Sequence, residues 1–88
     1  MNTIDLKSHI MKHVQLKKLY LTGDKNHIHI IAIGEIFIGM SSIEKQKTIY
    51  QPIIKYIVEK KIHAVTIDTF TVDEWKYSEL KKKRIKDT

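Results

Sequence analysis

The sequence predicts a single α+β domain in which a three-stranded mixed sheet is covered by helices on one face. Three features of the 88-residue chain support this prediction. Apolar residues recur at helical spacing near the start, two β-rich runs flank a turn-like segment, and two capping boxes each precede a helical stretch. In chain order the elements read α-β-β-α-β-α. A hairpin followed by a helical crossover to a third strand gives a mixed sheet.

The first predicted helix runs from about Thr3 to Val14. Its apolar stripe repeats every four residues and is widened by Met11. Asn2 is a suitable N-cap, and Asp5 complements the helix dipole in the first turn. The stripe consists of Leu6, Ile10 and Val14.

A hairpin is predicted next. Lys18 to Thr22 alternates between leucines on one face and polar residues on the other. Gly23 to Asn26 has the composition of a turn. The segment His27 to Ile33 is rich in β-branched residues and apolar on both faces, which indicates a central strand. One face carries Ile28, Ile30 and Ala32, and the other carries His27, His29, Ile31 and Ile33.

A short connection then leads to a helical segment interrupted by proline. We expect Phe37, in the connection, to fill part of the core. Ser41-x-x-Glu44 is a capping box, so a helix begins near Ser42. Pro52 either kinks this helix or opens a second one. The expected apolar face consists of Ile49, Ile53, Ile54, Ile57 and Val58.

The last strand and helix follow directly. Ile62 to Phe70 alternates cleanly and is predicted to be a strand. Thr71-x-x-Glu74 is a second capping box, which opens the last helix. We interpret Trp75 as a core anchor of this helix rather than a ligand-stacking residue.

Composition excludes several protein classes. The chain has no cysteine, so it forms no disulfide and cannot alone hold a thiolate-ligated zinc or a Cys₄ cluster. No apolar run approaches the roughly 18 residues that a membrane span needs, and no secretory signal pattern is visible. We therefore expect a cytoplasmic protein. Nucleotide-binding glycine loops and hydrolase motifs are missing from the sequence, so we expect no enzyme.

We expect residues 1–80 to form one domain and residues 81–88 to form a disordered basic tail. Residues 76–88 hold six of the 16 basic and two of the 10 acidic residues, so most of the net charge of +6 lies there. Such a tail can bind phosphate backbones. The alternative is a solvated tail without a partner, because 15 lysines against one arginine is the bias of an AT-rich genome. The basic residues of interest are Lys81, Lys82, Lys83 and Arg84.

The histidines are candidate metal ligands. His27 and His29 lie on one face of one strand, and their H-x-H spacing suits a shared metal. His63 could approach them if the second and third strands are neighbours. The alternative is that each is a half-exposed polar residue with a local hydrogen bond. His9 and His13, at positions i and i+4 of the first helix, form a weaker candidate pair.

Several of these residues, taken together, resemble the BolA family over about residues 16–76. The match includes His27-Ile28, Glu35-x-Phe37-x-Gly39, Ser42-x-x-x-Gln46-x-x-x-Tyr50, Ile62-His63-Ala64-Val65-x-Ile67 and Thr71-x-x-Glu74-Trp75. Gln46 and the Gly39-Met40-Ser41 turn look like the acid-stress branch of the bacterial family.

The resemblance implies a fold like the class II KH domain and a protein partner, a monothiol glutaredoxin. In such pairs a [2Fe–2S] cluster lies between the two proteins. The glutaredoxin cysteine and glutathione supply thiolates, and the BolA chain supplies imidazole. His63 matches the C-terminal histidine ligand of the family. Mixed ligation of this kind raises the reduction potential relative to an all-thiolate cluster.

The second ligand from this chain is left open. The family usually places a histidine or cysteine in the loop between the first two strands, and Gly23 to Asn26 contains neither. His27 follows this loop directly and matches a family histidine at the start of the strand. His29, Asp24 or a more labile cluster are the alternatives.

A second hypothesis is a DNA- or RNA-binding transcriptional regulator, as the family is also described. KH domains clamp nucleic acid with a G-x-x-G loop, whereas residues 39–42 lack the second glycine. Contact would then use the tail or the helix that carries Lys45, Lys47 and Lys55. Co-expression with a monothiol glutaredoxin separates the hypotheses, since only the first predicts a brown complex. Whether the chain forms a homodimer is left open.

Overall fold

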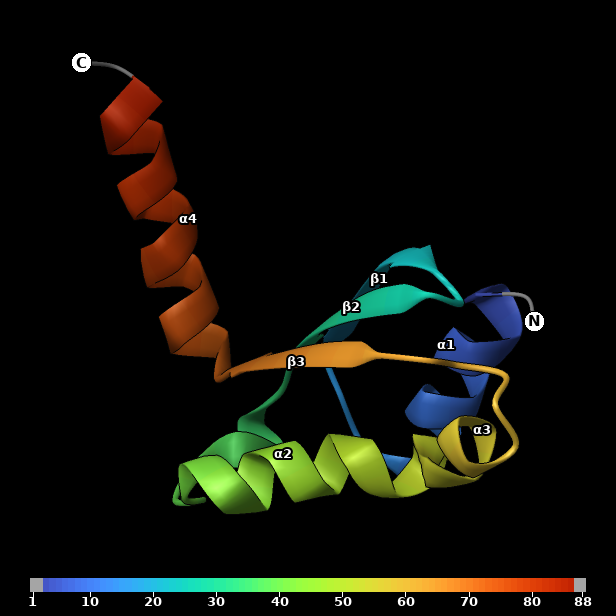
Figure 1. Cartoon of the computed structure of the whole chain (residues 1–88). Helices are drawn as coiled ribbons and strands as arrows, with labels where there is room; N and C mark the ends of the chain where they lie inside the picture. The colour runs from blue at the N-terminus through green and yellow to red at the C-terminus, as the bar shows by residue number, and fades with distance from the viewer. Residues whose placement is uncertain (1–2, 87–88) are drawn as a thin grey trace.

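A computed structural model describes the backbone of residues 3–86 and the side chains of residues 5–80. One layer is a three-stranded sheet, and α1, α2 and α3 lie on one of its faces (Figure 1). The predicted order of helices and strands is confirmed. The elements are α1 (Thr3–His13), β1 (Lys18–Asp24), β2 (His27–Ile33), η1 (Glu35–Phe37), α2 (Ser42–Tyr50), η2 (Gln51–Ile53), α3 (Ile54–Val58), β3 (Val65–Phe70) and α4 (Val72–Lys86).

The sheet has the order β1-β2-β3, so β2 is the central strand, as its two apolar faces predicted. β1 pairs with β2 antiparallel, and β3 pairs with β2 parallel. Ile30 lies opposite Leu21 on one side and Ile67 on the other. Because paired residues point to the same face, this register directs one set of apolar side chains toward the helices.

The core lies between the sheet and the helices. Phe37 is fully buried, which confirms that the connection after β2 fills part of the core. The predicted stripe of α1 is buried as well, but Met11 is 39% exposed and does not widen it. Met11 is exposed because α1 packs through one narrow line of contacts. The buried stripe is Leu6, Ile10 and Val14.

The helical crossover is broken at Pro52. The Ser41–Glu44 capping box is formed in both directions, and α2 begins at Ser42 as predicted. One turn of 3₁₀-helix carries Pro52, and the shorter α3 follows it. The break rotates the face that follows, so Ile54 and Val58, predicted to be apolar contacts, are 41% and 73% exposed.

β3 begins at Val65, three residues later than predicted. Lys60 adopts a left-handed conformation with φ of 61°, which ends the helical segment. The following residues lie alongside the hairpin turn: the His63 N–H donates to the Lys25 carbonyl at 2.8 Å. Residues 62–64 therefore approach the sheet without forming a regular strand.

The last helix, α4, leaves the end of β3 and points away from the other helices (Figure 1). Trp75 is half-buried against the rings of Tyr20 and Phe70, at centroid distances of 5.7 and 5.2 Å. It anchors α4 to the second face of the sheet and is not one of the buried residues of the core between the sheet and the helices.

The backbone helix of α4 continues to Lys86, through most of the segment for which the sequence predicted a disordered tail. Lysine and arginine are good helix formers, which explains the continuation. The division of the chain at residue 80 stays a prediction. Among the described residues, no helix has the length and apolar character needed to cross a bilayer.

Candidate functional site

The β1–β2 turn forms one side of the candidate site. Asp24 and His27 are the last paired residues of the hairpin, so only Lys25 and Asn26 form the turn itself. The Asp24 carboxylate accepts hydrogen bonds from the N–H groups of Asn26 (2.9 Å) and His27 (3.4 Å). These hydrogen bonds stabilise the turn and occupy one carboxylate oxygen of Asp24, which was an alternative cluster ligand in the sequence analysis.

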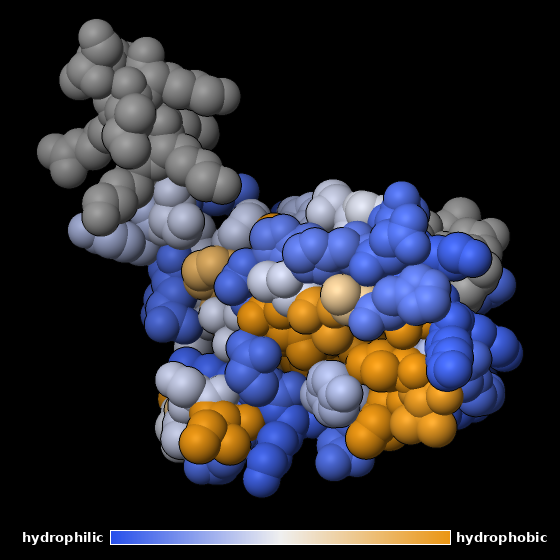
Figure 2. Space-filling model, in the orientation of Figure 1, coloured by the Kyte–Doolittle hydropathy of each residue, from blue (hydrophilic) through white to orange (hydrophobic). Residues whose placement is uncertain are grey.

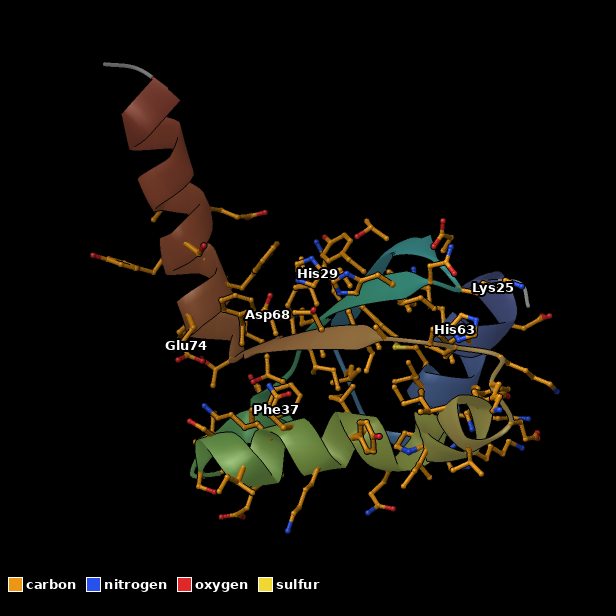
Figure 3. All side chains as sticks on the ribbon, viewed as in Figure 1. Lys25, His29, Phe37, His63, Asp68 and Glu74 are labelled. Atoms are coloured by element: carbon orange, nitrogen blue, oxygen red, sulfur yellow. The ribbon has the colours of Figure 1, made fainter. Side chains whose placement is uncertain are left out.

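His63 lies beside this turn, at the end of the sheet where β3 begins (Figure 3). Its backbone N–H bonds to the Lys25 carbonyl, and the next carbonyl, of Ala64, accepts from Ile28 at 3.0 Å. These two bonds fix the backbone on both sides of the side chain. His63 itself is exposed, so its imidazole is accessible to a partner protein.

His27 and His29 lie on the sheet face that α1, α2 and α3 do not cover. His27 Nε2 is 2.7 Å from the Thr66 hydroxyl, and His29 Nε2 is 2.6 Å from the Asp68 carboxylate. A carboxylate accepts, so Nε2 of His29 carries the proton and Nδ1 is the nitrogen left to act as a ligand. Both histidines thus have the local hydrogen bonds that the non-metal interpretation expected.

The three imidazoles do not gather at one point. His29 pairs with Asp68 near the middle of the sheet, whereas His63 lies at the end, next to Lys25 (Figure 3). His63 precedes β3, whose first residue, Val65, lies opposite Ile28, so the β2–β3 pairing does not assign the His63 side chain to either face of the sheet. Among the described side chains, no group of three potential ligands could hold a metal ion. Ligation by His63, His27 or His29 stays a prediction and requires ligands from a partner.

Gln46 has a role that the sequence did not reveal. Its side-chain Nε2 donates to the main-chain carbonyl of Ile67 at 2.8 Å, so it joins α2 to the outer side of β3. The sequence indicated Gln46 only as a mark of family resemblance. A helical polar residue at a helix–sheet boundary was the available signal, but its bonding partner depends on tertiary packing.

The lysines proposed for nucleic-acid contact do not form one patch. Lys45 lies near Glu74, whereas Lys55 has its ammonium 5.3 Å from the centre of the Tyr56 ring. Lys45 lies on α2 and Lys55 on α3, with the break at Pro52 between them. Lys47 is exposed on α2. The side chains of Lys81, Lys82, Lys83 and Arg84 lie outside the described residues.

Apolar residues are exposed on the helical layer. Figure 2 shows apolar surface between β3 and α2 that continues over α3, with a smaller area at the start of α2. Large apolar side chains that are exposed on these helices include Val58 of α3 and Ile43 of α2, at 73% and 67%. Since α3 lies at the same end of the molecule as His63, an apolar contact surface is available near that imidazole.

The chain matches the model of a protein family described as "BolA-like protein" over residues 2–74. The "Acid stress protein IbaG" of Escherichia coli (strain K12) is 40% identical over 75 residues, which cover 85% of this chain and 89% of that protein. An uncharacterized protein, BU385, of Buchnera aphidicola subsp. Acyrthosiphon pisum (strain APS) is 45% identical over 75 residues, covering 85% of this chain and 94% of that protein.

Solved structures share the fold. The crystal structure of a bol-like protein from Babesia bovis has a TM-score of 0.75 and 17% identity, and covers 90% of this chain and 94% of that chain. A BolA protein homologue from Coxiella burnetii has a TM-score of 0.71 and 22% identity, and covers 86% and 97%. The BolA domain of SufE1 from Arabidopsis thaliana has a TM-score of 0.70 and 16% identity, and covers 81% and 92%.

Proposed function

The chain belongs to the BolA-like protein family, and from this premise we propose that it is a non-enzymatic adaptor that binds a monothiol glutaredoxin and co-ligates a [2Fe–2S] cluster. Because a relative at 40% identity is named an acid stress protein, we place the adaptor in a stress response. The cluster would be held for trafficking or sensing in the cytoplasm.

The observation that carries the proposal is the placement of His63. The imidazole is exposed at the end of the sheet, while backbone bonds from His63 to Lys25 and from Ile28 to Ala64 hold the chain on which it stands. An accessible ligand on a fixed backbone is what a cluster shared between two proteins requires, since the partner must approach without displacing it.

The ligand set is divided between the proteins. This chain has no cysteine, so the thiolates come from the glutaredoxin and from glutathione. His63 is the first imidazole ligand. For the second, His27 is favoured over His29, because His27 borders the hairpin turn whereas His29 is held by Asp68 further along the sheet.

The test is co-expression with a monothiol glutaredoxin, followed by visible absorption and circular dichroism of the purified complex. The wild-type pair should be brown, and His63→Ala should change the visible circular dichroism and shorten the lifetime of the cluster. The matched control is His13→Ala, because His13 is also exposed but lies on α1. An unchanged spectrum and lifetime for His63→Ala would rule out His63 as a ligand.

Weak nucleic-acid binding is a second candidate function, favoured by the course of α4. This helix points away from the rest of the molecule, and its last residues belong to the basic segment of the sequence (Figure 1). The positive charge of this segment of the sequence favours contact with a phosphate backbone.

A further inference from the structure

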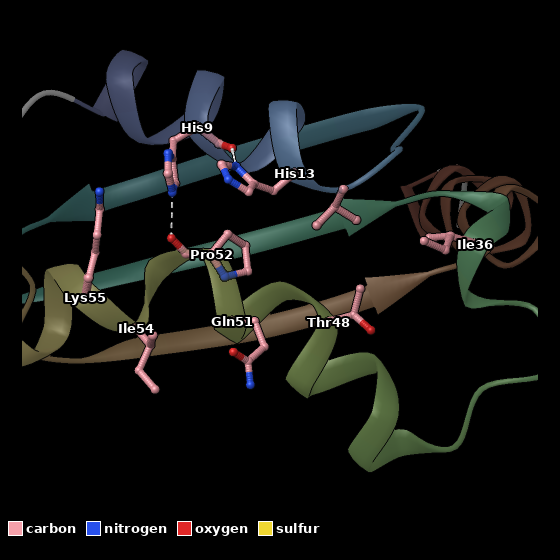
Figure 4. A pocket seen from close by; sticks show the side chains of 9 residues that line it. His9, His13, Ile36, Thr48, Gln51, Pro52, Ile54 and Lys55 are labelled. Carbon is pink, nitrogen blue, oxygen red and sulfur yellow. Dashed lines mark hydrogen bonds between the residues drawn. The ribbon is translucent and has the colours of Figure 1, made fainter.

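A groove of about 510 Å³ lies between α1 and the helical segment broken at Pro52 (Figure 4). Small-molecule sites commonly have volumes of about 300–1,000 Å³ and mostly apolar walls. The apolar lining comprises Val14, Ile36, Pro52 and Ile54. Ile36 and Ile54 are 39% and 41% exposed, so a ligand that covers them would remove apolar surface from water.

The titratable residues that line this α1–α3 groove are His9, His13 and Lys55, and no carboxylate is among the residues that line it. In Figure 4, His9 lies between His13 and Lys55. The rings of His9 and His13 are 4.4 Å apart. An apolar floor with cationic groups along one side is complementary to a molecule that has an apolar body and an anionic head.

Two main-chain carbonyls fix the tautomers of the histidines. His9 Nε2 donates to the Pro52 carbonyl at 2.7 Å, and His13 Nδ1 donates to the His9 carbonyl at 2.8 Å. A carbonyl oxygen only accepts, so these two nitrogens carry hydrogens. In neutral His13 the other nitrogen, Nε2, therefore has a lone pair and cannot donate to an anion. Protonation converts Nε2 into a charged donor.

We propose that the α1–α3 groove binds a small carboxylate with an apolar body, and that protonation of His13 strengthens this binding. The apolar body lies on Ile36, Pro52 and Ile54. The carboxylate accepts from the Lys55 ammonium, and from His13 Nε2 once that ring is protonated. Histidine is the side chain whose charge ordinarily changes between about pH 5 and pH 8.

The surroundings of His13 favour an anion. On α1 its neighbour is His9, and on α3 the facing groups are Lys55 and Tyr56, whose ring meets His9 edge-on at 5.4 Å. Two carboxylates line adjacent hollows. Glu35 lines one with Lys17 and Ile36, and Asp5 lines the other with Lys12 and His9. Among the described residues, no carboxylate lines the groove itself.

The experiment uses octanoate as the probe and the full chain as the protein. Titrations followed by amide NMR shifts and by calorimetry at about pH 6 and about pH 8 should give binding that is about tenfold tighter at the lower pH, as one added charged hydrogen bond predicts. His13→Gln should remove this pH dependence, because a glutamine side chain does not change its charge between these pH values. Lys55→Gln should weaken binding at both pH values, and Lys47→Gln, an exposed lysine outside the groove, should match the wild type.

Three results would overturn the proposal. The first is equal binding of octanoate and uncharged 1-octanol, which would show hydrophobic adsorption alone. The second is a pH dependence that persists in His13→Gln. The third is an absence of octanoate shifts at Val14, Ile36 and Ile54 together with shifts there on adding glutaredoxin, which would assign the groove to the protein partner. His13 is exposed, so its substitution leaves the fold intact.

Discussion

Single side chains at the start of α4 connect pH to local structure. The pKa of the Glu74 carboxyl is lowered, mainly because the backbone N–H of Thr71 donates to it at 2.7 Å. The Thr71 side chain and the charge of Lys45 act in the same direction, and partial desolvation opposes them. A lowered pKa means that the ionised form stabilises the folded helix start. This contribution is present at neutral pH and is lost as pH falls through the lowered pKa of Glu74.

We therefore expect Glu74→Ala to reduce the helicity of the first turn of α4 at pH 7, as read from carbon chemical shifts. The difference from wild type should narrow as pH falls through the lowered pKa of Glu74, because the wild-type carboxyl then also becomes protonated. Glu79→Ala is the control, since Glu79 is exposed in the same helix outside the capping box. An undiminished difference in acid would show that the Glu74 charge does not contribute.

A second prediction at this level concerns the cluster ligands. His27→Ala should shorten the lifetime of the cluster in the glutaredoxin complex more than His29→Ala does, because His27 adjoins the hairpin turn beside His63. His29 is held by Asp68, and losing it should mainly remove that exposed pair, which is worth about 1 kcal/mol or less. Equal and negligible effects on the lifetime would redirect the search for the second ligand to Asp24.

The sequence predicted the placement of these histidines only in part. Alternation along β2 correctly put His27 and His29 on one face, since side chains of a strand alternate whatever the fold. Their partners Thr66 and Asp68 depend on the register between β2 and β3, which a single sequence does not specify. For the same reason the distance between His63 and the other two imidazoles could not be predicted.

Among the secondary-structure elements, the hairpin gives the sharpest mutational test. Gly23 has φ of +99°, and a Cβ there would lie 2.1 Å from the His27 carbonyl oxygen. Gly23→Ala should therefore destabilise the protein by clearly more than about 1 kcal/mol. The alanine would adopt a strained positive φ, and the His27 backbone would also have to move away from its Cβ. Gly39 has φ of +83° but open space around its Cβ position, so Gly39→Ala isolates the conformational cost of about 1–2 kcal/mol.

Urea unfolding of both variants measures this difference. A Gly23→Ala variant that is no less stable than Gly39→Ala would mean that the hairpin accommodates a side chain by a small shift. Because the turn contacts His63 through Lys25, the Gly23 variant should also bind the cluster more weakly.

Element boundaries were predictable where local chemistry determines them. Both capping boxes formed where Ser41 and Thr71 indicated, because a cap involves only residues three positions apart. The start of β3 was not predictable from Ile62, since the left-handed Lys60 and the bonds to the hairpin decide where pairing begins. From the sequence, Pro52 could either kink one helix or open a second one. The structure has a 3₁₀ turn at Pro52, and His9 of α1 is hydrogen-bonded to the Pro52 carbonyl.

For the molecule as a whole, charge is concentrated near the end of the chain. We expect weak, non-specific binding to duplex DNA, with a salt slope of about −0.9 per neutralised phosphate. Truncation after Leu80 removes Lys81, Lys82, Lys83, Arg84 and Lys86, and should remove most of this slope while glutaredoxin binding persists. Fluorescence anisotropy over a range of salt concentrations measures the slope.

A truncated protein that still prefers one duplex over a scrambled duplex would contradict this expectation. Recognition would then lie on the helix carrying Lys45 and Lys47, and the regulator hypothesis would precede the adaptor hypothesis. Wild-type and truncated proteins should have the same thermal stability, which controls for loss of fold.

The arrangement of the sheet and the three helices on one face was predictable from the sequence. The packing of α4 on the opposite face of the sheet was not. A hairpin and a helical crossover leave few topologies, so the sheet order followed from the order of the elements. That Trp75 would pack on Tyr20 and Phe70, opposite the main core, depends on the direction in which α4 leaves β3. No local pattern around Trp75 specifies this direction.

The Gln46 side chain has a consequence for how copies of this protein meet. β3 borders the sheet, and the Ile67 carbonyl on its outer side would otherwise be available to a strand from another molecule. Exposed strand borders of this kind are templates for aggregation. The Gln46 side-chain amide donates to that carbonyl at 2.8 Å, so one acceptor in the middle of the outer side of β3 is already occupied. An incoming strand would have to displace the Gln46 amide before it could pair with the middle of β3.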